Sequence, residues 1–452
     1  MKVASDASFS SGLLTLKVEC RTPVADFELL TSGPTADGAP DLHDLTFYQR
    51  RFWQMEKAFP NTSGYVLAGL LRSPAFEDAE LLRKAVQATI EDNDATRLRM
   101  RSVPGGVRQY VRQPVADEVA VLDFAQAPES MREWIQKTST TPFVMEDSDL
   151  FYTAVLRLGA REHGVFIKAH HLVGDEWSSR LLARQISDRY ALLRGGERPT
   201  SQTRHSYLDY VRSEEEYLRS DRFVKHRAYW ENRFGDLPED VVARVSVPVD
   251  DSQKTSGFQV CQLSLAPHAA ALEQEQVSLL CVSLAAFARY FKTVKQQEDV
   301  VFGLPTYNRV THQERNTIGM FANSALLRVT MDANADHRAV VDTVRSELHY
   351  LLKYQRYPYP LLKQFIEEKY GFKGHLYQTY VSFAQSEESD YQVEYFIKHT
   401  QYCPLIVRIY HQAARNQVAF HFYYWKEDYS PQDIERLFEF VSTQFNQLAT
   451  AA

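Results

Sequence analysis

The feature that most constrains the fold of this chain is an alternation of helical and strand-like segments that occurs twice along it. Residues 77–91 carry apolar side chains at helical spacing, and residues 164–171 have the composition of a strand. After Pro238 the same kinds of segment begin again, including an apolar helical run at 277–288. The pattern therefore predicts two comparable α/β halves that are joined within residues 215–240.

The length of the chain agrees with two halves. Its 452 residues exceed the roughly 250–300 residues at which a single hydrophobic core stops growing. We expect one lobe over residues 42–215 and a second lobe over residues 216–452. Residues 1–41 are expected to be an N-terminal extension, in which apolar and polar residues alternate at 14–19 and 27–29, and this alternation predicts a β-hairpin or an edge strand. This extension is either a docking element for a partner or an additional strand of the main fold.

Composition excludes several classes of function. The 51 Lys and Arg residues against 58 Asp and Glu residues give a net charge of −7, which argues against a nucleic-acid-binding protein. The longest apolar run, 277–288, is too short to cross a bilayer, and the N-terminus has no apolar export signal. Four cysteines, at positions 20, 261, 281 and 403, lie far apart, as isolated thiols do in a reducing compartment. We therefore expect a soluble cytoplasmic protein that binds neither nucleic acid nor membrane.

One cluster of residues is chemically suggestive: His170-His171-Leu172-Val173-Gly174-Asp175, at the end of the strand-like run. Adjacent strand residues point to opposite faces, so the two histidines are not expected to share a metal ion. An imidazole with a pKa near 6.5 can accept a proton from an amine or an alcohol near neutral pH. The alternative is a pair of core histidines beside a helix that Asp175 caps.

Motifs along the rest of the chain match those of one known family, in the family's order. The matching segments are Leu45–Trp53 (SxAQxRLW), Asn93–Arg99 (RHExLRT), His170–Asp175 (HHxxxDG), Tyr207–Tyr210 (YxDY), Ile318–Val329 with the preceding Gly303–Arg309 (IGxFxNxLPLR), and Gln355–Tyr359 (HQxYPF). The chain thus resembles the condensation domains of nonribosomal peptide synthetases, which belong to the chloramphenicol-acetyltransferase-like superfamily. The resemblance covers about residues 42–450, which is everything except the N-terminal extension.

The resemblance implies a fold and a reaction. The fold is of the α/β (α+β) class, with two acetyltransferase-like lobes in a V-shaped pseudo-dimer around a central tunnel. An acyl or peptidyl carrier protein would deliver the donor as a thioester on its phosphopantetheine arm. The acceptor, an amine or hydroxyl on a small molecule or on a second carrier, would enter from the other side, and an amide or ester would form. The chain itself would bind no cofactor and no metal.

The resemblance also assigns roles to residues of the histidine motif. His171 would be the active-site histidine, which takes the proton of the attacking amine or positions that amine. His170 would make a structural hydrogen bond, and Asp175 would pair with Arg309 across the cleft. Gly174 lets the backbone turn sharply, and it would lend an N–H group or simply room near the reacting carbonyl.

Three further positions are candidates for contact with substrate. Ser382 falls on a strand that faces the tunnel in relatives, and Asn323 belongs to the IGxFxN segment. Glu176 stands where the family usually has glycine. Its side chain would crowd the tunnel or contact a polar acceptor, unless it is a solvated residue in the first turn of a helix.

Several alternatives stay open at this point. The chain contains no adenylation or carrier domain, so we expect a condensation enzyme that is free-standing or excised and that meets its carrier proteins in trans. Within the superfamily, the rivals are an acyl-CoA-dependent O- or N-acyltransferase and a dehydrating or epimerising variant. A catalytically silent recruitment module is the rival from another class, and the intact His171 argues against it.

Overall fold

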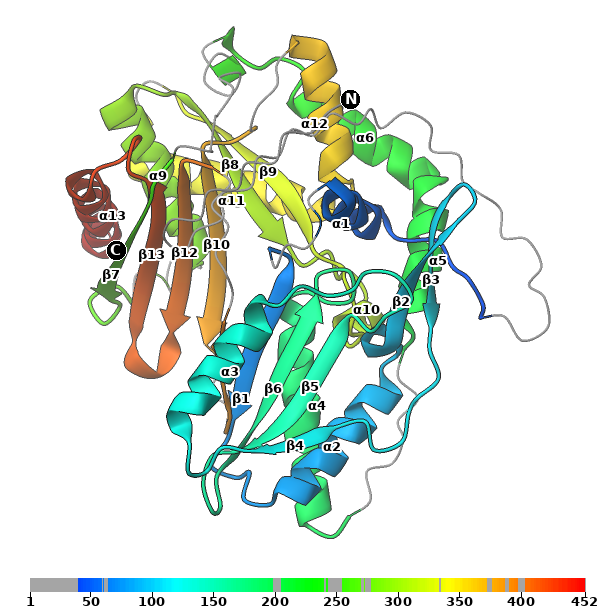
Figure 1. Cartoon of the computed structure of the whole chain (residues 1–452). Helices are drawn as coiled ribbons and strands as arrows, with labels where there is room; N and C mark the ends of the chain where they lie inside the picture. The colour runs from blue at the N-terminus through cyan, green and yellow to red at the C-terminus, as the bar shows by residue number, and fades with distance from the viewer. Residues whose placement is uncertain are drawn as a thin grey trace.

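The computed structural model describes residues 40–58, 60, 64–197, 205–239, 241–242, 254–269, 272, 278–332, 335–371, 376–386, 390–396 and 403–451. The predicted N-terminal hairpin and Cys20 lie outside these residues. The described residues form two α/β lobes, one above the other in Figure 1, and each lobe is built around its own sheet. The predicted mixed α/β architecture is confirmed.

The first lobe holds a five-stranded sheet in the order β11-β1-β6-β5-β4. Its strands are β1 (Val66–Arg72), β4 (Ala120–Asp123), β5 (Phe151–Arg157), β6 (His163–His170) and β11 (Gln392–Tyr395). Helices α2 (Ala79–Asp92) and α4 (Glu176–Arg194) cover one face, and α3 (Pro128–Thr140) covers the other. Beside the sheet lie α1 (Phe47–Ala58), the turn η1 (Asp94–Arg97), and a hairpin of β2 (Leu98–Val103) and β3 (Gly106–Val111).

The central strand β6 shows why this sheet is covered on both faces. Its neighbours Val165 and Phe166 point to opposite faces, and both are fully buried. Val165 packs in the cluster under α2 and α4, and Phe166 packs in the cluster under α3. The helix predicted at 77–91 is α2, and Asp78 caps it by accepting hydrogen bonds from the Glu80 and Leu81 N–H groups.

The second lobe holds a six-stranded sheet in the order β7-β13-β12-β10-β8-β9. Its strands are β7 (Ser256–Ser264), β8 (Asp299–Thr306), β9 (Asn323–Thr330), β10 (Thr379–Ser386), β12 (Leu405–Gln412) and β13 (Gln417–Trp425), with the turn η3 (Ala413–Arg415) between the last two. Its helices are α9 (Leu279–Lys295), the one-turn α10 (His312–Arg315), α11 (His337–Lys353), α12 (Tyr359–Tyr370) and α13 (Pro431–Ala451). The apolar run predicted as a buried helix is α9, which lies in the largest core cluster.

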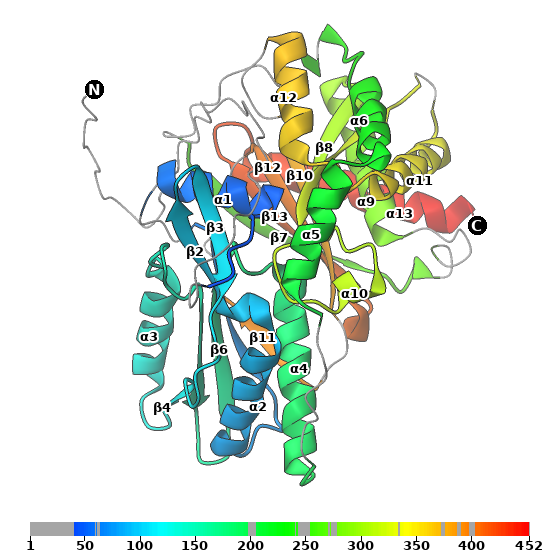
Figure 2. The same ribbon diagram turned by 90° about the vertical axis from the view of Figure 1, so that its right-hand side faces the viewer.

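Two connections join the lobes. Helices α5 (Tyr207–Leu218) and α6 (Asp221–Arg233) lead from the first lobe to the second, and Figure 2 shows α5 directly above α4. Further along the chain, β11 leaves the second lobe and pairs with β1, so it completes the first lobe's sheet. A division at residues 215/216 therefore cuts through α5 and does not separate the two sheets.

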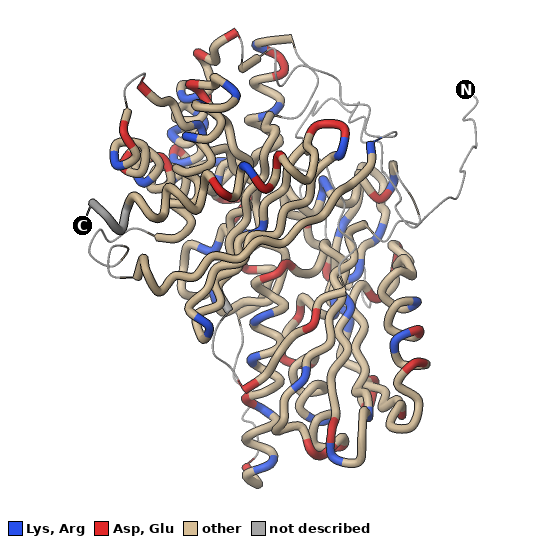
Figure 3. Tube along the Cα trace, turned by 90° about the vertical axis from the view of Figure 1, so that its left-hand side faces the viewer, with Lys and Arg blue, Asp and Glu red and all other residues tan. Residues whose placement is uncertain are grey.

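The distribution of charge on the surface and the state of the described cysteines can be compared with what the composition predicts. On the side shown in Figure 3, acidic and basic residues are interspersed over the part of the chain that the structure describes. Cys261, Cys281 and Cys403 are in no disulfide. Among the described helices, none combines the length and the apolar character that crossing a bilayer requires.

Candidate active site

The histidine motif occupies the connection between β6 and α4. His170 is the last residue of β6, and Asp175 is the residue before the first turn of α4. The Asp175 carboxylate accepts a hydrogen bond from the Ser178 N–H group at 2.8 Å, which is a standard cap for a helix start. The helix therefore begins at Glu176, as the sequence predicts.

His170 has partners for both of its ring nitrogens. Nδ1 accepts a hydrogen bond from the Leu172 N–H group at 3.0 Å, and Nε2 lies 3.0 Å from Oε1 of Glu56 on α1. Because Nδ1 accepts, the ring proton resides on Nε2, which donates to the carboxylate. With its side chain 1% exposed and both nitrogens used, His170 holds α1 against the end of β6, in line with its predicted structural role.

His171 has a different environment. Its backbone N–H donates to the Tyr65 carbonyl at 2.9 Å, and its ring stacks on Phe52 of α1, with centroids 5.2 Å apart and planes 8° from parallel. Nδ1 is buried and has no hydrogen-bond partner among the described residues. Nε2 has no hydrogen-bond partner among these residues either, and unlike Nδ1 it is not fully buried, so Nε2 is the ring nitrogen that can meet a substrate.

The electrostatics keep His171 neutral. The pKa of His171 is lowered to about 4; burial is the main cause and the neighbouring His170 adds to it, while Asp175 and the Gly174 backbone oppose the shift. Burial lowers the pKa because the charged imidazolium loses its hydration. A neutral ring can accept a hydrogen bond from an amine at neutral pH.

The Asp175 carboxylate connects the two lobes. Arg309, which follows β8, donates from Nη2 to both carboxylate oxygens, at 3.0 and 3.2 Å. The backbone N–H groups of Phe321 and Ala322 donate to Oδ2 at 3.0 and 3.2 Å. Both charged side chains are 1% exposed. The pairing of Asp175 with Arg309 that the resemblance implies is present, and it fixes the start of α4 against the β8–β9 connection.

Two expectations about this loop need adjustment. Gly174 does not have a left-handed backbone conformation, and a Cβ atom there would meet only Ser178 Cβ, at 3.8 Å. The turn itself therefore does not require glycine, which corrects that part of the sequence interpretation. Glu176 is exposed and pairs with Arg180 one turn later, at 2.7 Å. Glu176 is thus a solvated residue in the first turn of α4, which is the second of the two roles predicted for it.

Asn323 and Ser382 do not join the histidine motif. The Asn323 amide donates to the carbonyls of Gln355 and Tyr357 at 2.7 and 3.0 Å, and its oxygen accepts from the Tyr48 hydroxyl. Its polar atoms are occupied within the protein, so the structure corrects the expected substrate contact to a structural one. Ser382 lies half-buried on β10, opposite Arg408 of β12, and does not line the cavity beside Gly174.

That cavity has a volume of about 30 Å³, enough for about two water molecules. Its walls come from β1, β6, the start of α4 and β11, and include Ile167, Ala169, Gly174, Asp175, Val393 and Tyr395. The tunnel that the resemblance implies stays a prediction. No group of three metal-binding side chains is present within the described ranges.

Sequence reasoning missed the residues that surround the two histidines. Phe52 and Glu56 are on α1, inside or just after a motif that was recognised, and Tyr65 precedes β1. Their positions at i and i+4 on α1 place Phe52 and Glu56 on one helix face. That signal alone does not say which histidine each would contact.

Comparisons with known proteins agree on one family. Residues 41–452 match the model of the condensation domain family. Surfactin synthase subunit 1 of Bacillus subtilis (strain 168) is 31% identical over 333 residues, which are 71% of this chain and 9% of that protein. Tyrocidine synthase 3 of Brevibacillus parabrevis is 24% identical over 361 residues, which are 78% of this chain and 5% of that protein. The chain thus spans less than a tenth of the length of either relative.

Solved structures share the fold. The starter condensation domain of rhizomide synthetase RzmA superposes with a TM-score of 0.74 at 20% identity, covering 91% of this chain and 97% of that one. The first condensation domain of the CDA synthetase superposes with a TM-score of 0.72 at 20% identity, covering 90% and 97%. At these identities the likeness concerns the arrangement of helices and strands.

Proposed function

This chain belongs to the condensation domain family, and from that premise we propose that it transfers an acyl group from a carrier-protein thioester to an amine, forming an amide. The observation that carries the proposal is the contrast between the two motif histidines. His170 is saturated by structural hydrogen bonds, whereas His171 keeps Nε2 for a substrate. The acyl or peptidyl carrier proteins that deliver the donor, and the acceptor itself, are part of this proposal.

The low pKa of His171 favours positioning over full proton removal. With a pKa of about 4, roughly one imidazole in a thousand is charged at pH 7, and the ring is a weak base. In the tautomer with its proton on Nδ1, Nε2 accepts a hydrogen bond from the acceptor amine and directs the nitrogen lone pair at the thioester carbonyl. The C–N bond forms as the C–S bond breaks, and the amine proton ends on the released thiol.

The surrounding contacts support this task. Phe52 stacked on the imidazole restricts the orientation of the ring, and the Asp175–Arg309 pair holds the loop that carries it. A catalytic group fixed in this way loses little freedom when substrate binds, so orientation contributes directly to the rate. No covalent intermediate on the protein is required.

The experiment supplies donors and acceptors separately. We would mix the protein with acyl-loaded carrier proteins in trans and with matched amine and alcohol acceptors, and follow the products by intact mass. The expected result is amide formation by the wild type and its loss in His171→Ala. The matched control is His226→Ala, because His226 is a buried histidine of α6 far from the motif in sequence. Amide formation that survives in His171→Ala would overturn the proposed role of that residue.

A second donor class enters the same experiment. A double mutant of the starter condensation domain of rhizomide synthetase RzmA has been solved in complex with C8-CoA and Leu-SNAC, and it superposes on this chain with a TM-score of 0.75. Octanoyl-CoA without carrier protein is therefore the second donor to test. Transfer from octanoyl-CoA alone would move the function to a CoA-dependent acyltransferase, and transfer to the alcohol would change the bond to an ester. Silence with both donors would favour a recruitment module.

A further inference from the structure

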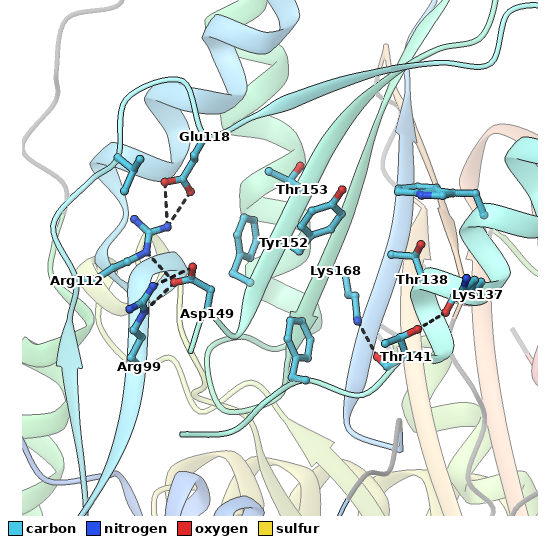
Figure 4. A pocket seen from close by; sticks show the side chains of 14 residues that line it. Arg99, Arg112, Glu118, Lys137, Thr138, Thr141, Asp149, Tyr152, Thr153 and Lys168 are labelled. Carbon is cyan, nitrogen blue, oxygen red and sulfur yellow. Dashed lines mark hydrogen bonds and ion pairs between the residues drawn. The ribbon is translucent and has the colours of Figure 1, made fainter. Parts of the chain in front are cut away.

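A second, larger pocket lies in the first lobe, and Figure 4 shows it from close by. Its volume is about 690 Å³, within the roughly 300–1,000 Å³ range of small-molecule sites. Strands β5 and β6 form its floor, the end of α3 with the following loop forms one wall, and Arg99 of β2 with Arg112, the residue after β3, forms the other. Nothing in the proposed acyl transfer uses this pocket.

Lys168 is the unusual residue of its lining. It lies two residues before the end of β6, is 5% exposed, and has no carboxylate within ion-pairing distance among the described residues. Its Nζ donates to the Thr141 carbonyl at 2.7 Å and lies 4.3 Å from the centre of the Phe143 ring. Burial lowers the pKa of Lys168, as expected for an ammonium without a counter-ion.

The two arginines of the pocket are already neutralised. Arg99 and Arg112 both donate to Asp149, at 3.0 and 2.7 Å, and Arg112 also pairs with Glu118 at 2.9 Å. Figure 4 shows this paired group on one side of the pocket and Lys168 on the other. The uncompensated charge of the lining is therefore concentrated near Lys168, with the exposed Lys137 at the rim.

Helix capping accounts for only part of the position of Lys168. Thr141 is the C-cap residue directly after α3, so the ammonium also meets the negative end of the helix dipole. This contact engages one of the three N–H donors of the lysine. The contact with Thr141 explains neither the empty volume beside the Lys168 side chain nor the apolar surface that faces this side chain.

Aromatic side chains supply that apolar surface. Trp134, Phe143, Phe151 and Tyr152 line the pocket together with several threonines. We propose that this pocket binds a small amphipathic oxyanion, with a carboxylate or phosphate at Lys168 and an aromatic or acyl body against the rings. The Phe143 ring also packs edge-on against His170, with centroids 6.2 Å apart, so the pocket adjoins the base of the active-site loop.

The test compares an acid with its neutral analogue on the full chain. Isothermal titration calorimetry would measure 3-phenylpropionate, phenyl phosphate and the neutral 3-phenylpropionamide. We expect at least one oxyanion to bind about tenfold or more tightly than the amide, since a buried charge pair adds to the shared apolar contact. The ratio of the first two affinities tells a carboxylate site from a phosphate site.

Variants locate the binding. Lys168→Met keeps the length of the side chain and removes its charge, and it should abolish the preference for the oxyanion. Lys225→Met, at an exposed lysine of α6, is the matched control and should leave the preference unchanged. Quenching of Trp134 emission, lost in Trp134→Phe, reports binding in this pocket independently.

Three results would overturn the proposal. The first is that the amide binds as tightly as the acids. The second is that binding of none of the three probes reaches saturation below about 10 mM. The third is that Lys168→Met keeps the preference for the oxyanion. If Lys168→Met fails to fold, the comparison of acid with amide on the wild type and the Trp134 signal still decide. A lysine that only caps α3 would give a less stable variant and no difference between acid and amide.

Discussion

Two buried arginine–aspartate clusters occupy different parts of the molecule. Arg309 and Asp175 are both 1% exposed, lie 134 residues apart, and join α4 of the first lobe to the β8–β9 connection of the second. Arg328 and Asp299 are 5% and 6% exposed, lie 29 residues apart, and join the neighbouring strands β8 and β9 within the second lobe. The closest contact is 3.0 Å in the first cluster and 2.6 Å in the second.

The difference lies in what else each carboxylate holds. Asp175 accepts hydrogen bonds from the backbone of Phe321 and Ala322 and also caps the helix that follows the histidine motif. The second cluster extends to Asp236, which pairs with Arg328 at 2.6 Å. Burial and pairing therefore indicate a contribution to stability in both clusters. Only the link to the loop that carries His171 predicts an effect on function.

The largest expected effect comes from removing one partner of either cluster. Asp175→Ala should lower the free energy of unfolding by about 3–5 kcal/mol, because it leaves the buried Arg309 guanidinium without its carboxylate. Asp299→Ala should lower it by less, because Asp236 still pairs with Arg328. Urea unfolding measures the loss. Turnover of the remaining folded protein, at low temperature, should fall in Asp175→Ala and persist in Asp299→Ala. Equal loss of turnover in both variants would remove the distinction between the clusters.

The next effect separates two histidines whose pKa values are lowered by burial of their rings. His171 is next to the first cluster, whereas His226 is on α6, where the Tyr217 hydroxyl lies 3.0 Å from its Nδ1. Burial lowers the pKa of both to about 4. His171→Ala should reduce turnover about 10²–10⁴-fold with little change in stability, and His226→Ala should reduce stability with little change in turnover. Kinetics and urea unfolding on both variants check this, and a reversed pattern would contradict it.

A smaller effect concerns pH. An unfolded histidine titrates near 6.5, whereas the folded pKa of His226 is about 4. Between these values the unfolded state binds a proton that the folded state does not, so stability falls as pH decreases from about 6.5 to 4. The free energy of unfolding of the wild type, measured by urea titration, should therefore drop between pH 7 and pH 5. In His226→Ala this drop should be smaller by about 1–2 kcal/mol; an unchanged drop would mean that His226 is protonated in the folded state.

The smallest expected effect comes from Glu176. Its carboxylate is exposed and pairs with Arg180, although it follows Asp175 directly in the chain. Glu176→Gly should change turnover less than about threefold and should cost about 1 kcal/mol of stability through helix propensity. Michaelis–Menten kinetics with one amine acceptor measure this. A large gain in turnover would show that the Glu176 side chain obstructs the acceptor.

The sequence was sufficient for features that depend on local pattern. Helical spacing located α2 and α9, and the sequence around Asp175 located the start of α4. The Asp175–Arg309 pair came from family resemblance, because no local pattern relates residues 134 positions apart.

Features that depend on tertiary packing were beyond the sequence. Asn323 has a donor and an acceptor that a substrate could use, and only the folded positions of Tyr48 and Gln355 show that both are occupied. Alternation along β6 places Lys168 and His170 on one face, yet it says nothing about the volume left beside them. Strand β11 has four residues, too few for a reliable periodic signal.

Strand β11 has a consequence for recombination between relatives. A chimera that joins the first 215 residues of one parent to the remainder of another would inherit β1 and β11 from different parents. These strands pair from Gly69↔Tyr395 to Arg72↔Gln392. A Cβ atom at Gly69 would lie 3.2 Å from a Val393 methyl and 3.3 Å from the Glu394 carbonyl oxygen. An exchange that moves residues 390–396 together with the first lobe keeps this inherited fit, and an exchange at a single crossover point breaks it.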